Sequence, residues 1–301
     1  MSERPTIEVS KVFGEWTVDL LDVGGLSLDG GSMFGSVPRG LWGQWIPPDE
    51  QHRIPLAMRC LLLRHASTGA VVLVDTGVGD KFDEKFANRF AVRAPEGAAE
   101  DLPLAYALGR VGVGLGEVTH VLLTHLHFDH GGGLSGRNAS GDLAPTFPEA
   151  THWVQRQNLE TAEAPNPRER ASYLPDNVGP LRDAPLEIVD GETELLPGLS
   201  VLVSHGHTSG MQMVRLEGGG RVLFYPADLA PTHHHVPVAF TMGYDLCSRE
   251  IMAEKSRIWP SMVEDEAVVV FEHDHGFAAG RLGVERGRYG VREEVRFVDG
   301  A

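Results

Sequence analysis

The stretch Thr124-His125-Leu126-His127-Phe128-Asp129-His130 places four side chains that can bind metals within six residues. It follows the short apolar run Val121-Leu122-Leu123, which is typical of a strand buried on both faces of a sheet. Open α/β sheets carry their functional groups at the C-terminal ends of such strands. The two-residue period of a strand would direct His125 and His127 the same way, and the glycines at 131–133 would allow a sharp turn. The stretch therefore predicts a metal site.

The same pattern recurs along the chain, because five apolar runs each end in histidine or aspartate. One such ending would mean little, but five in order indicate that one edge of a sheet converges on a single site. The endings are Asp75, the block from His125 to His130, the pair His205 and His207, Asp228, and the pair His273 and His275.

The donors at these endings are numerous enough for two metals. Two divalent cations that share a site about 3.5–4 Å apart need roughly six or seven protein ligands. Imidazole and carboxylate donors suit zinc, iron, manganese or cobalt, and residue type does not choose among them. In the predicted arrangement His125, His127 and His207 hold one metal, Asp129, His130 and His273 hold the other, and Asp228 bridges both.

Composition narrows the class of protein. A chain of 301 residues with 42% hydrophobic and 23% charged residues is long enough for one large α/β domain or two small ones. Its net charge of −16 repels phosphate backbones, which lowers the expectation of a nuclease. No signal peptide or membrane-length apolar stretch is expected, and two distant cysteines do not form a disulfide framework. Cytoplasmic residence is therefore the default expectation.

The remaining helices and strands are predicted from the periodicity of apolar residues and from the residues that interrupt it. Helices are expected near residues 80–90, 102–111, 155–163 and 245–259, the last with Asp245 or Ser248 as its cap. Strands are expected within 61–74, at 152–154, 222–225 and 268–271, and in the tail at 284–298. Residues 165–185 are rich in proline and charge, which indicates an irregular inserted excursion that could serve as a lid or an oligomer contact.

Large apolar side chains interrupt the glycine-rich N-terminal segment. Residues 32–42 include Phe34 and Trp42. They could pack on the sheet or form one wall of a substrate pocket, and the two interpretations carry equal weight because pockets are themselves apolar.

The motifs resemble those of the metallo-β-lactamase fold superfamily over about residues 55–280. They are V-D-T-G at Asp75, the T-H-L-H-F-D-H block, G-H-T at 206–208, P-A-D at Asp228 and F-E-H-D at His273. The resemblance implies an αββα sandwich, in which two mixed sheets lie face to face with helices on the outer faces. It further implies one domain over 1–301, with an N-terminal extension over about 1–55 and an excursion over about 160–185, and it gives Asp75 a supporting role beside the ligands.

Within the superfamily the chain looks most similar to the lactonase and phosphotriesterase-type branch, because it has a long N-terminal segment and the F-E-H-D motif. The implied activity is that of a hydrolase that opens a lactone or cleaves a small ester with a hydroxide held between two metals. Zinc is the first candidate for both metals, and Asp129 and Asp228 are the predicted catalytic residues. Phosphotriesterase activity could accompany it. The alternatives are a phosphodiesterase or nuclease of the same fold, a thioesterase and, last, a non-catalytic sensor.

The chain also departs from the family pattern. His205 competes with His207 as a ligand, and His275 competes with His273; the flanking Gly206 and Thr208 favour His207, and the following Asp274 favours His273.

Substrate contacts are less well defined. Many acyl-homoserine lactonases carry a tyrosine three residues after the bridging aspartate, where this chain has Pro231, so the oxyanion donor stays open between Tyr173, Tyr244 and others. His234 or His235, in a run of three histidines, could touch the substrate. The expected partner is a small molecule, with no nucleic acid or membrane, and a homodimer could form through the apolar N-terminal loop or the excursion.

Overall fold

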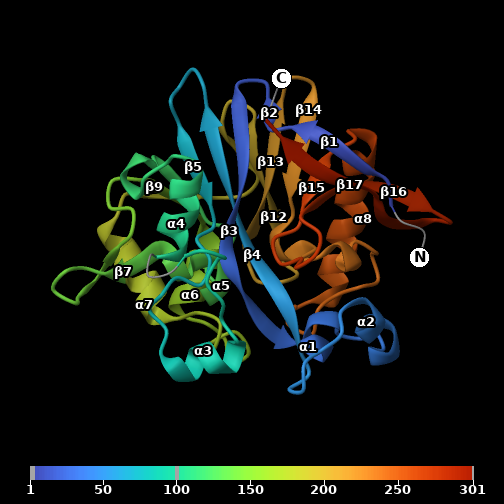
Figure 1. The fold of residues 1–301 in the computed structure, drawn as a ribbon, viewed down its shortest axis with the longest axis horizontal. Coiled ribbons are helices and arrows are strands. Elements are labelled where there is room, and N and C mark those ends of the chain that lie inside the picture. Colours follow the sequence, from blue (N-terminus) through green and yellow to red (C-terminus); the bar gives the residue numbers. More distant parts are fainter. Residues whose placement is uncertain (1–3, 99–101, 300–301) are drawn as a thin grey trace.

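Two mixed β-sheets lie face to face, and helices cover their outer faces (Figure 1). The computed structural model describes residues 4–98 and 102–299. This architecture confirms the predicted αββα sandwich. The apolar side chains between the sheets form one core, and a second core lies between the first sheet and its helices.

The first sheet has the strand order β10-β9-β6-β5-β4-β3-β2, in which β10, β9, β6 and β5 are parallel and the rest antiparallel. Among its parallel strands, β5 is continuously apolar, as expected of a strand whose two faces are covered. The strands are β2 (Val12–Phe13), β3 (Trp16–Asp29), β4 (Arg53–His65), β5 (Val71–Val74), β6 (His120–Leu122), β9 (Thr151–Gln155) and β10 (Leu186–Val189).

The second sheet has the order β1-β17-β16-β15-β14-β13-β12-β11, and only the β1–β17 and β14–β15 pairs are parallel. A separate two-stranded sheet joins β7 (Ser135–Arg137) to β8 (Leu143–Pro145). The strands of the second sheet are β1 (Thr6–Ser10), β11 (Thr193–Leu196), β12 (Leu199–Ser204), β13 (Met211–Gly218), β14 (Arg221–Tyr225), β15 (Val268–Val270), β16 (Ala279–Glu285) and β17 (Arg288–Val298).

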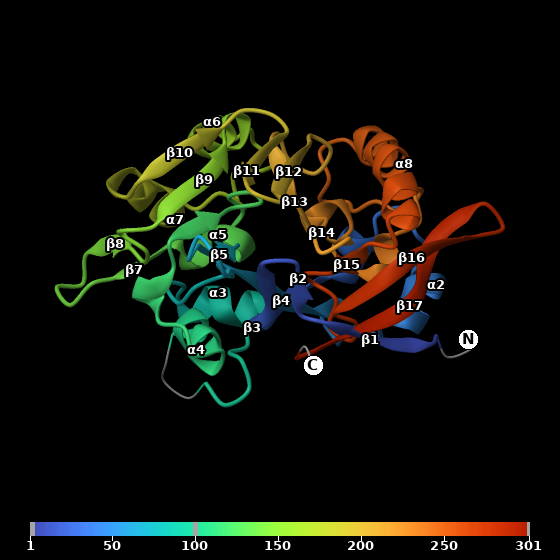
Figure 2. The same ribbon diagram turned by 90° about the horizontal axis from the view of Figure 1, so that it is seen from above.

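Some helices pack against the first sheet and others against the second, as the view from above shows (Figure 2). Helix α8 packs against the second sheet through β12 and β16, whereas α4 and α6 pack against β3 and β9 of the first. The helices are α1 (Gly30–Phe34), α2 (Arg39–Trp45), α3 (Glu84–Phe90), α4 (Pro103–Arg110), α5 (Phe128–Gly131), α6 (Arg156–Glu163), α7 (Pro175–Val178) and α8 (Ser248–Glu264). No helix in the two described ranges combines the length and apolar character needed to cross a membrane.

Helix α8 begins later than predicted. Its N-cap is Cys247, which makes no side-chain capping hydrogen bond, so neither Asp245 nor Ser248 is the cap. The carboxylate of Asp245 instead accepts a hydrogen bond from the backbone N–H of Met242, in the loop before the helix, at 2.7 Å.

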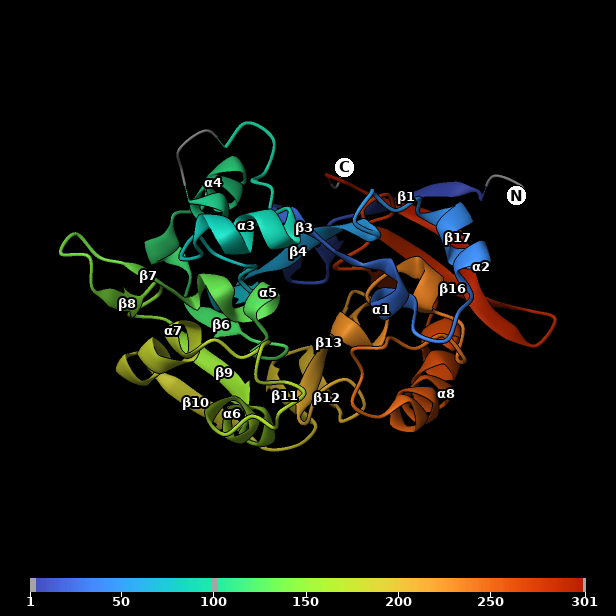
Figure 3. The ribbon, with the colours of Figure 1, turned by 90° about the horizontal axis from the view of Figure 1, so that it is seen from below.

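The long β3–β4 hairpin carries α1 and α2 across to the second half of the chain (Figure 3). There the backbone N–H of Gly243 donates to the carbonyl of Ser32 at 2.7 Å, and His235 Nε2 lies 2.8 Å from the carbonyl oxygen of Met33. The N-terminal segment therefore packs beside residues 233–243, close to the loops that follow β14.

Candidate metal centre

The predicted ligands meet between the two sheets, at the C-terminal ends of five strands. Asp75 follows β5 and the His125–His130 block follows β6 in the first sheet. In the second sheet, His207 follows β12, Asp228 follows β14 and His273 follows β15. These short apolar strands fix where each loop begins, so residues far apart in the sequence point into one buried space.

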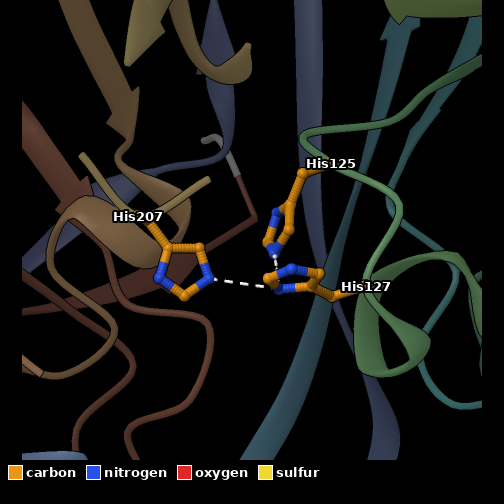
Figure 4. Close-up of side chains that lie close together, drawn as sticks. All are labelled: His125, His127 and His207. Atoms are coloured by element: carbon orange, nitrogen blue, oxygen red, sulfur yellow. Dashed lines mark hydrogen bonds between the residues drawn. The ribbon is translucent and has the colours of Figure 1, made fainter. Parts of the chain in front are cut away.

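Three histidines form the first group of facing nitrogen atoms (Figure 4). His125 Nε2 lies 3.0 Å from His127 Nδ1, and His207 Nε2 lies 3.2 Å from the same nitrogen. All three side chains are buried. Burial, followed by the neighbouring imidazoles, lowers the pKa of His125 and His127 well below the usual value, so both rings are neutral and can act as ligands.

Asp129, His130 and His273 form the second group. His273 Nε2 lies 3.2 Å from His130 Nε2 and 3.8 Å from Asp129 Oδ2. All three are buried. The two groups thus contain the same residues that the sequence analysis grouped, and their role as metal ligands stays a prediction.

Asp228 lies between the two groups. Its Oδ2 is 3.0 Å from His207 Nε2 and 3.5 Å from His130 Nε2, and its Oδ1 is 3.5 Å from His273 Nε2. Although burial opposes ionisation, His207 and His130 hold the pKa of Asp228 well below its usual range. An ionised carboxylate in this position can face two cations at once.

The donor set fits two divalent cations. Three of the atom groups that converge here have every potential ligand atom within 4.8 Å of the others: His125, His127 and His207; His125, His130 and Asp228; and Asp129, His130 and His273. Asp228 Oδ1 is buried with no hydrogen-bond partner among the described residues. Buried imidazoles that face one another around a buried carboxylate are expensive unless a cation binds them.

The other nitrogen of three of these rings is held by a protein acceptor, which fixes the ring orientation. His207 Nδ1 lies 3.0 Å from Asp245 Oδ1, and His273 Nδ1 lies 2.9 Å from the carbonyl oxygen of Ala57. His130 Nδ1 lies 3.1 Å from both Asp75 Oδ2 and Glu272 Oε2. Sequence reasoning had identified Asp75 alone among these acceptors.

Asp75 also binds the strand end that precedes the ligands. The backbone N–H and the hydroxyl of Thr124 each donate to its carboxylate at 2.7 Å. Burial and the nearby Glu272 carboxylate raise the pKa of Asp75 to about 6.

The competing histidines lie outside the centre. His205 is exposed, and its Nδ1 accepts a hydrogen bond from the backbone N–H of Gly210 at 3.2 Å. His275 is also exposed. The structure therefore brings His207 and His273 to the centre and leaves their competitors at the surface.

Phe34 and Trp42, the predicted pocket residues of the N-terminal segment, pack against each other, and Phe34 also packs against His235. Phe34 stacks on Trp42, with ring centroids 5.6 Å apart, and on His235 at 4.9 Å. Both nitrogens of His235 are engaged, by Thr232 Oγ1 and by the carbonyl of Met33, each at 2.8 Å. Phe34, Trp42 and His235 are buried. Only His234, which stacks on Trp45 at 4.8 Å, is partly exposed.

Tyr173 is held by hydrogen bonds behind the centre. Its hydroxyl lies 2.7 Å from Thr208 Oγ1 and accepts from Asn158 Nδ2 at 3.1 Å, while its ring meets His127 edge-on at 4.7 Å. Burial raises the pKa of Tyr173 well above its usual value. Because this residue belongs to the excursion, the excursion packs against the loop that carries His207.

Comparison with known proteins identifies relatives of this chain. Residues 55–257 match the model of the metallo-beta-lactamase superfamily. An N-acyl homoserine lactonase from Bacillus cereus is 28% identical over 211 residues, which cover 67% of this chain and 76% of that protein. A second N-acyl homoserine lactonase, from Bacillus sp, is 27% identical over 229 residues, which cover 73% of this chain and 82% of that lactonase.

Solved structures share the fold. A probable metal-dependent hydrolase from Staphylococcus aureus superposes with a TM-score of 0.81 at 26% identity, covering 90% of this chain and 93% of that one. A dizinc quorum-quenching lactonase superposes with a TM-score of 0.73 at 18% identity, covering 94% and 96% of the two chains. At that identity the second likeness supports the fold alone.

Proposed function

The chain belongs to the metallo-beta-lactamase superfamily, and from that premise we propose that it is a dinuclear metal-dependent hydrolase that opens lactones. The observation that carries the proposal is the convergence of seven donors between the sheets: His125, His127, Asp129, His130, His207, Asp228 and His273. The sequence relatives are N-acyl homoserine lactonases, which favours a lactone over other esters.

We assign one metal to His125, His127 and His207, the other to Asp129, His130 and His273, and a shared position to Asp228. Zinc is the metal proposed. When bound there, two such cations would supply a water of lowered pKa and would polarise the carbonyl oxygen of a substrate.

Other residues of the chain hold the proposed ligands in place and bury the centre. Asp245 and the carbonyl of Ala57 hold the rings of His207 and His273 from behind. The sheets bury the centre, so electrostatic interactions there are stronger than in water. We assign to Asp129 the transfer of the proton from the attacking water to the oxygen that leaves when the ring opens.

The cellular setting proposed is the cytoplasm, which agrees with the two free cysteines, Cys60 and Cys247. A homodimer stays a prediction of the sequence.

The test combines metal content with turnover of a lactone panel that includes acyl homoserine lactones. Protein purified without chelators should contain roughly two metals per chain and open at least one lactone. Asp228→Asn should fold and lose that turnover, whereas Asp183→Asn, a change at an exposed aspartate, should keep it. Two metals without lactone turnover would move the search to phosphodiesters and thioesters, and full activity in Asp228→Asn would contradict the proposal.

A further inference from the structure

Glu272 is a buried carboxylate that the proposed chemistry does not use. It directly precedes His273, is 1% exposed, and neither of its oxygens has a hydrogen-bond partner among the described residues. A buried charge is costly unless a partner compensates it. The position of Glu272 therefore requires an explanation.

The atom that approaches Glu272 is the outer nitrogen of a proposed metal ligand. Glu272 Oε2 lies 3.1 Å from His130 Nδ1. The hydroxyl of Tyr225 lies near Glu272 but donates to the carbonyl of Arg59 at 2.7 Å.

Asp75 approaches the same nitrogen at the same distance, and only the Asp75 contact has hydrogen-bond geometry. The two carboxylates nevertheless differ in their other partners. Both oxygens of Asp75 already accept from Thr124, each at 2.7 Å. Asp75 thus has partners without His130, whereas Glu272 has none.

We propose that Glu272 is a positioning residue for the metal centre, whose negative charge acts together with Asp75 on the Nδ1 side of His130. A carboxylate beside Nδ1 keeps the ring hydrogen on that atom, which leaves the lone pair of Nε2 free to bind a metal. The second carboxylate also adds a buried negative charge close to two cations, which favours their binding. This inference rests on the proposed function, since it takes His130 as a metal ligand.

The test separates charge from shape. Glu272→Gln keeps the shape and removes the charge, whereas Glu272→Asp keeps the charge and shortens the side chain. Metal affinity is measured by competition with a chelator, using zinc as the probe and the full chain. We expect Glu272→Gln to bind zinc about 10–100-fold more weakly, the range found when the protein groups that contact the outer side of metal ligands are removed. Glu272→Asp should retain more affinity than Glu272→Gln, and Glu163→Gln, on the exposed surface, should match the wild type.

A packing role predicts the opposite order, because glutamine matches the shape of glutamate better than aspartate does. Wild-type affinity in Glu272→Gln, or a larger loss in Glu272→Asp, would overturn the inference alone. A wild-type protein that bound no zinc would overturn the proposed function and the inference with it.

A second readout does not require the variants to fold. Nitrogen-15 NMR of the zinc-loaded wild type reports which nitrogen of His130 carries the hydrogen. A hydrogen on Nδ1 is expected, and one on Nε2 would overturn the assignment of His130 as a metal ligand and the inference with it.

Discussion

At the scale of single residues, the protein atoms that contact the ring nitrogens distinguish the proposed metal ligands from the structural histidines. His207 and His273 each present Nε2 to the centre while Nδ1 meets a protein acceptor. His235 instead has both nitrogens engaged by protein atoms, at 2.8 Å each. A histidine of the second kind has no nitrogen left for a metal or a substrate, so we expect its role to be in stability.

His235 should make folding stability depend on pH. Burial, followed by the charge of Lys255, lowers the pKa of His235 from 6.5 to about 4. The unfolded chain therefore binds more protons between pH 4 and 6.5, and stability falls as the pH drops through that window. At pH 5 this site alone should cost about 2 kcal/mol relative to pH 7.

Urea denaturation at pH 7 and pH 5 checks this prediction. His235→Gln should be less stable at pH 7 but should lose less stability on acidification than the wild type. His275→Gln, a change at an exposed histidine, should keep the wild-type pH dependence. Equal pH dependence in wild type and His235→Gln would contradict the prediction.

The hydroxyl of Tyr173 distinguishes a structural from a catalytic tyrosine. Removal of a catalytic oxyanion donor costs about 10²–10³ in kcat. Because this hydroxyl is held by Thr208 and Asn158, Tyr173→Phe should instead lower stability by about 1–3 kcal/mol and change kcat for a lactone by much less than that.

Thermal unfolding and steady-state kinetics measure the two effects of Tyr173→Phe. Tyr106→Phe is the control, since the Tyr106 hydroxyl donates to the carbonyl of Glu96 in another part of the fold. A hundred-fold loss of kcat in Tyr173→Phe with unchanged stability would make Tyr173 the oxyanion donor.

At the scale of elements, the β3–β4 hairpin is fixed by a close backbone contact at its bulge. Gly25 and Arg93 exchange backbone hydrogen bonds of 2.9 and 2.7 Å. Gly24 has φ of +108°, and a Cβ atom there would lie 2.2 Å from the carbonyl oxygen of Arg93. This position accepts only glycine, because a side chain would meet backbone atoms that cannot move independently.

Gly24→Ala should therefore cost more stability than a glycine replacement that is strained in its backbone alone. The matched control is Gly69→Ala, whose φ is +72° but whose Cβ would meet no atom within 4 Å. We expect a loss of roughly 1–2 kcal/mol for Gly69→Ala and a clearly larger loss for Gly24→Ala. Chemical denaturation of both variants measures the difference, and similar losses would show that the contact with Arg93 adds nothing.

At the scale of the whole molecule, the proposed metals connect the two sheets. The ligands His125 to His130 come from the loop after β6 in the first sheet, and His207, Asp228 and His273 come from loops of the second. A cation that binds this set binds only the folded chain, so metal should stabilise the fold by mass action.

Removal of metal should lower both activity and stability. Free zinc at one hundred times its dissociation constant should stabilise the chain by about 2.7 kcal/mol per site. Dialysis against a chelator should lower the melting temperature and abolish lactone turnover, and added zinc should restore both. Asp228→Asn should gain less stability from zinc than the wild type does, and an equal gain would contradict the shared role of Asp228.

The sequence by itself determined where the buried strands and the donors lie along the chain, and the resemblance of its motifs to a known superfamily implied the αββα fold. The short apolar runs before Asp75, His125 and Asp228 mark buried strands, and the order of the motifs identifies the superfamily. The strands and their ends can be predicted from the sequence because they depend on residues that are close together in the chain.

Only the tertiary structure decided what lies behind the ligands. Asp245 looked like a helix cap in the sequence and instead meets His207, and Glu272 meets His130 from the loop after a strand of the opposite sheet. Tyr173 lies in an excursion whose proline-rich pattern predicts no partner for its hydroxyl. Such contacts arise when two sheets pack face to face, and no local pattern encodes which distant side chains the packing brings together.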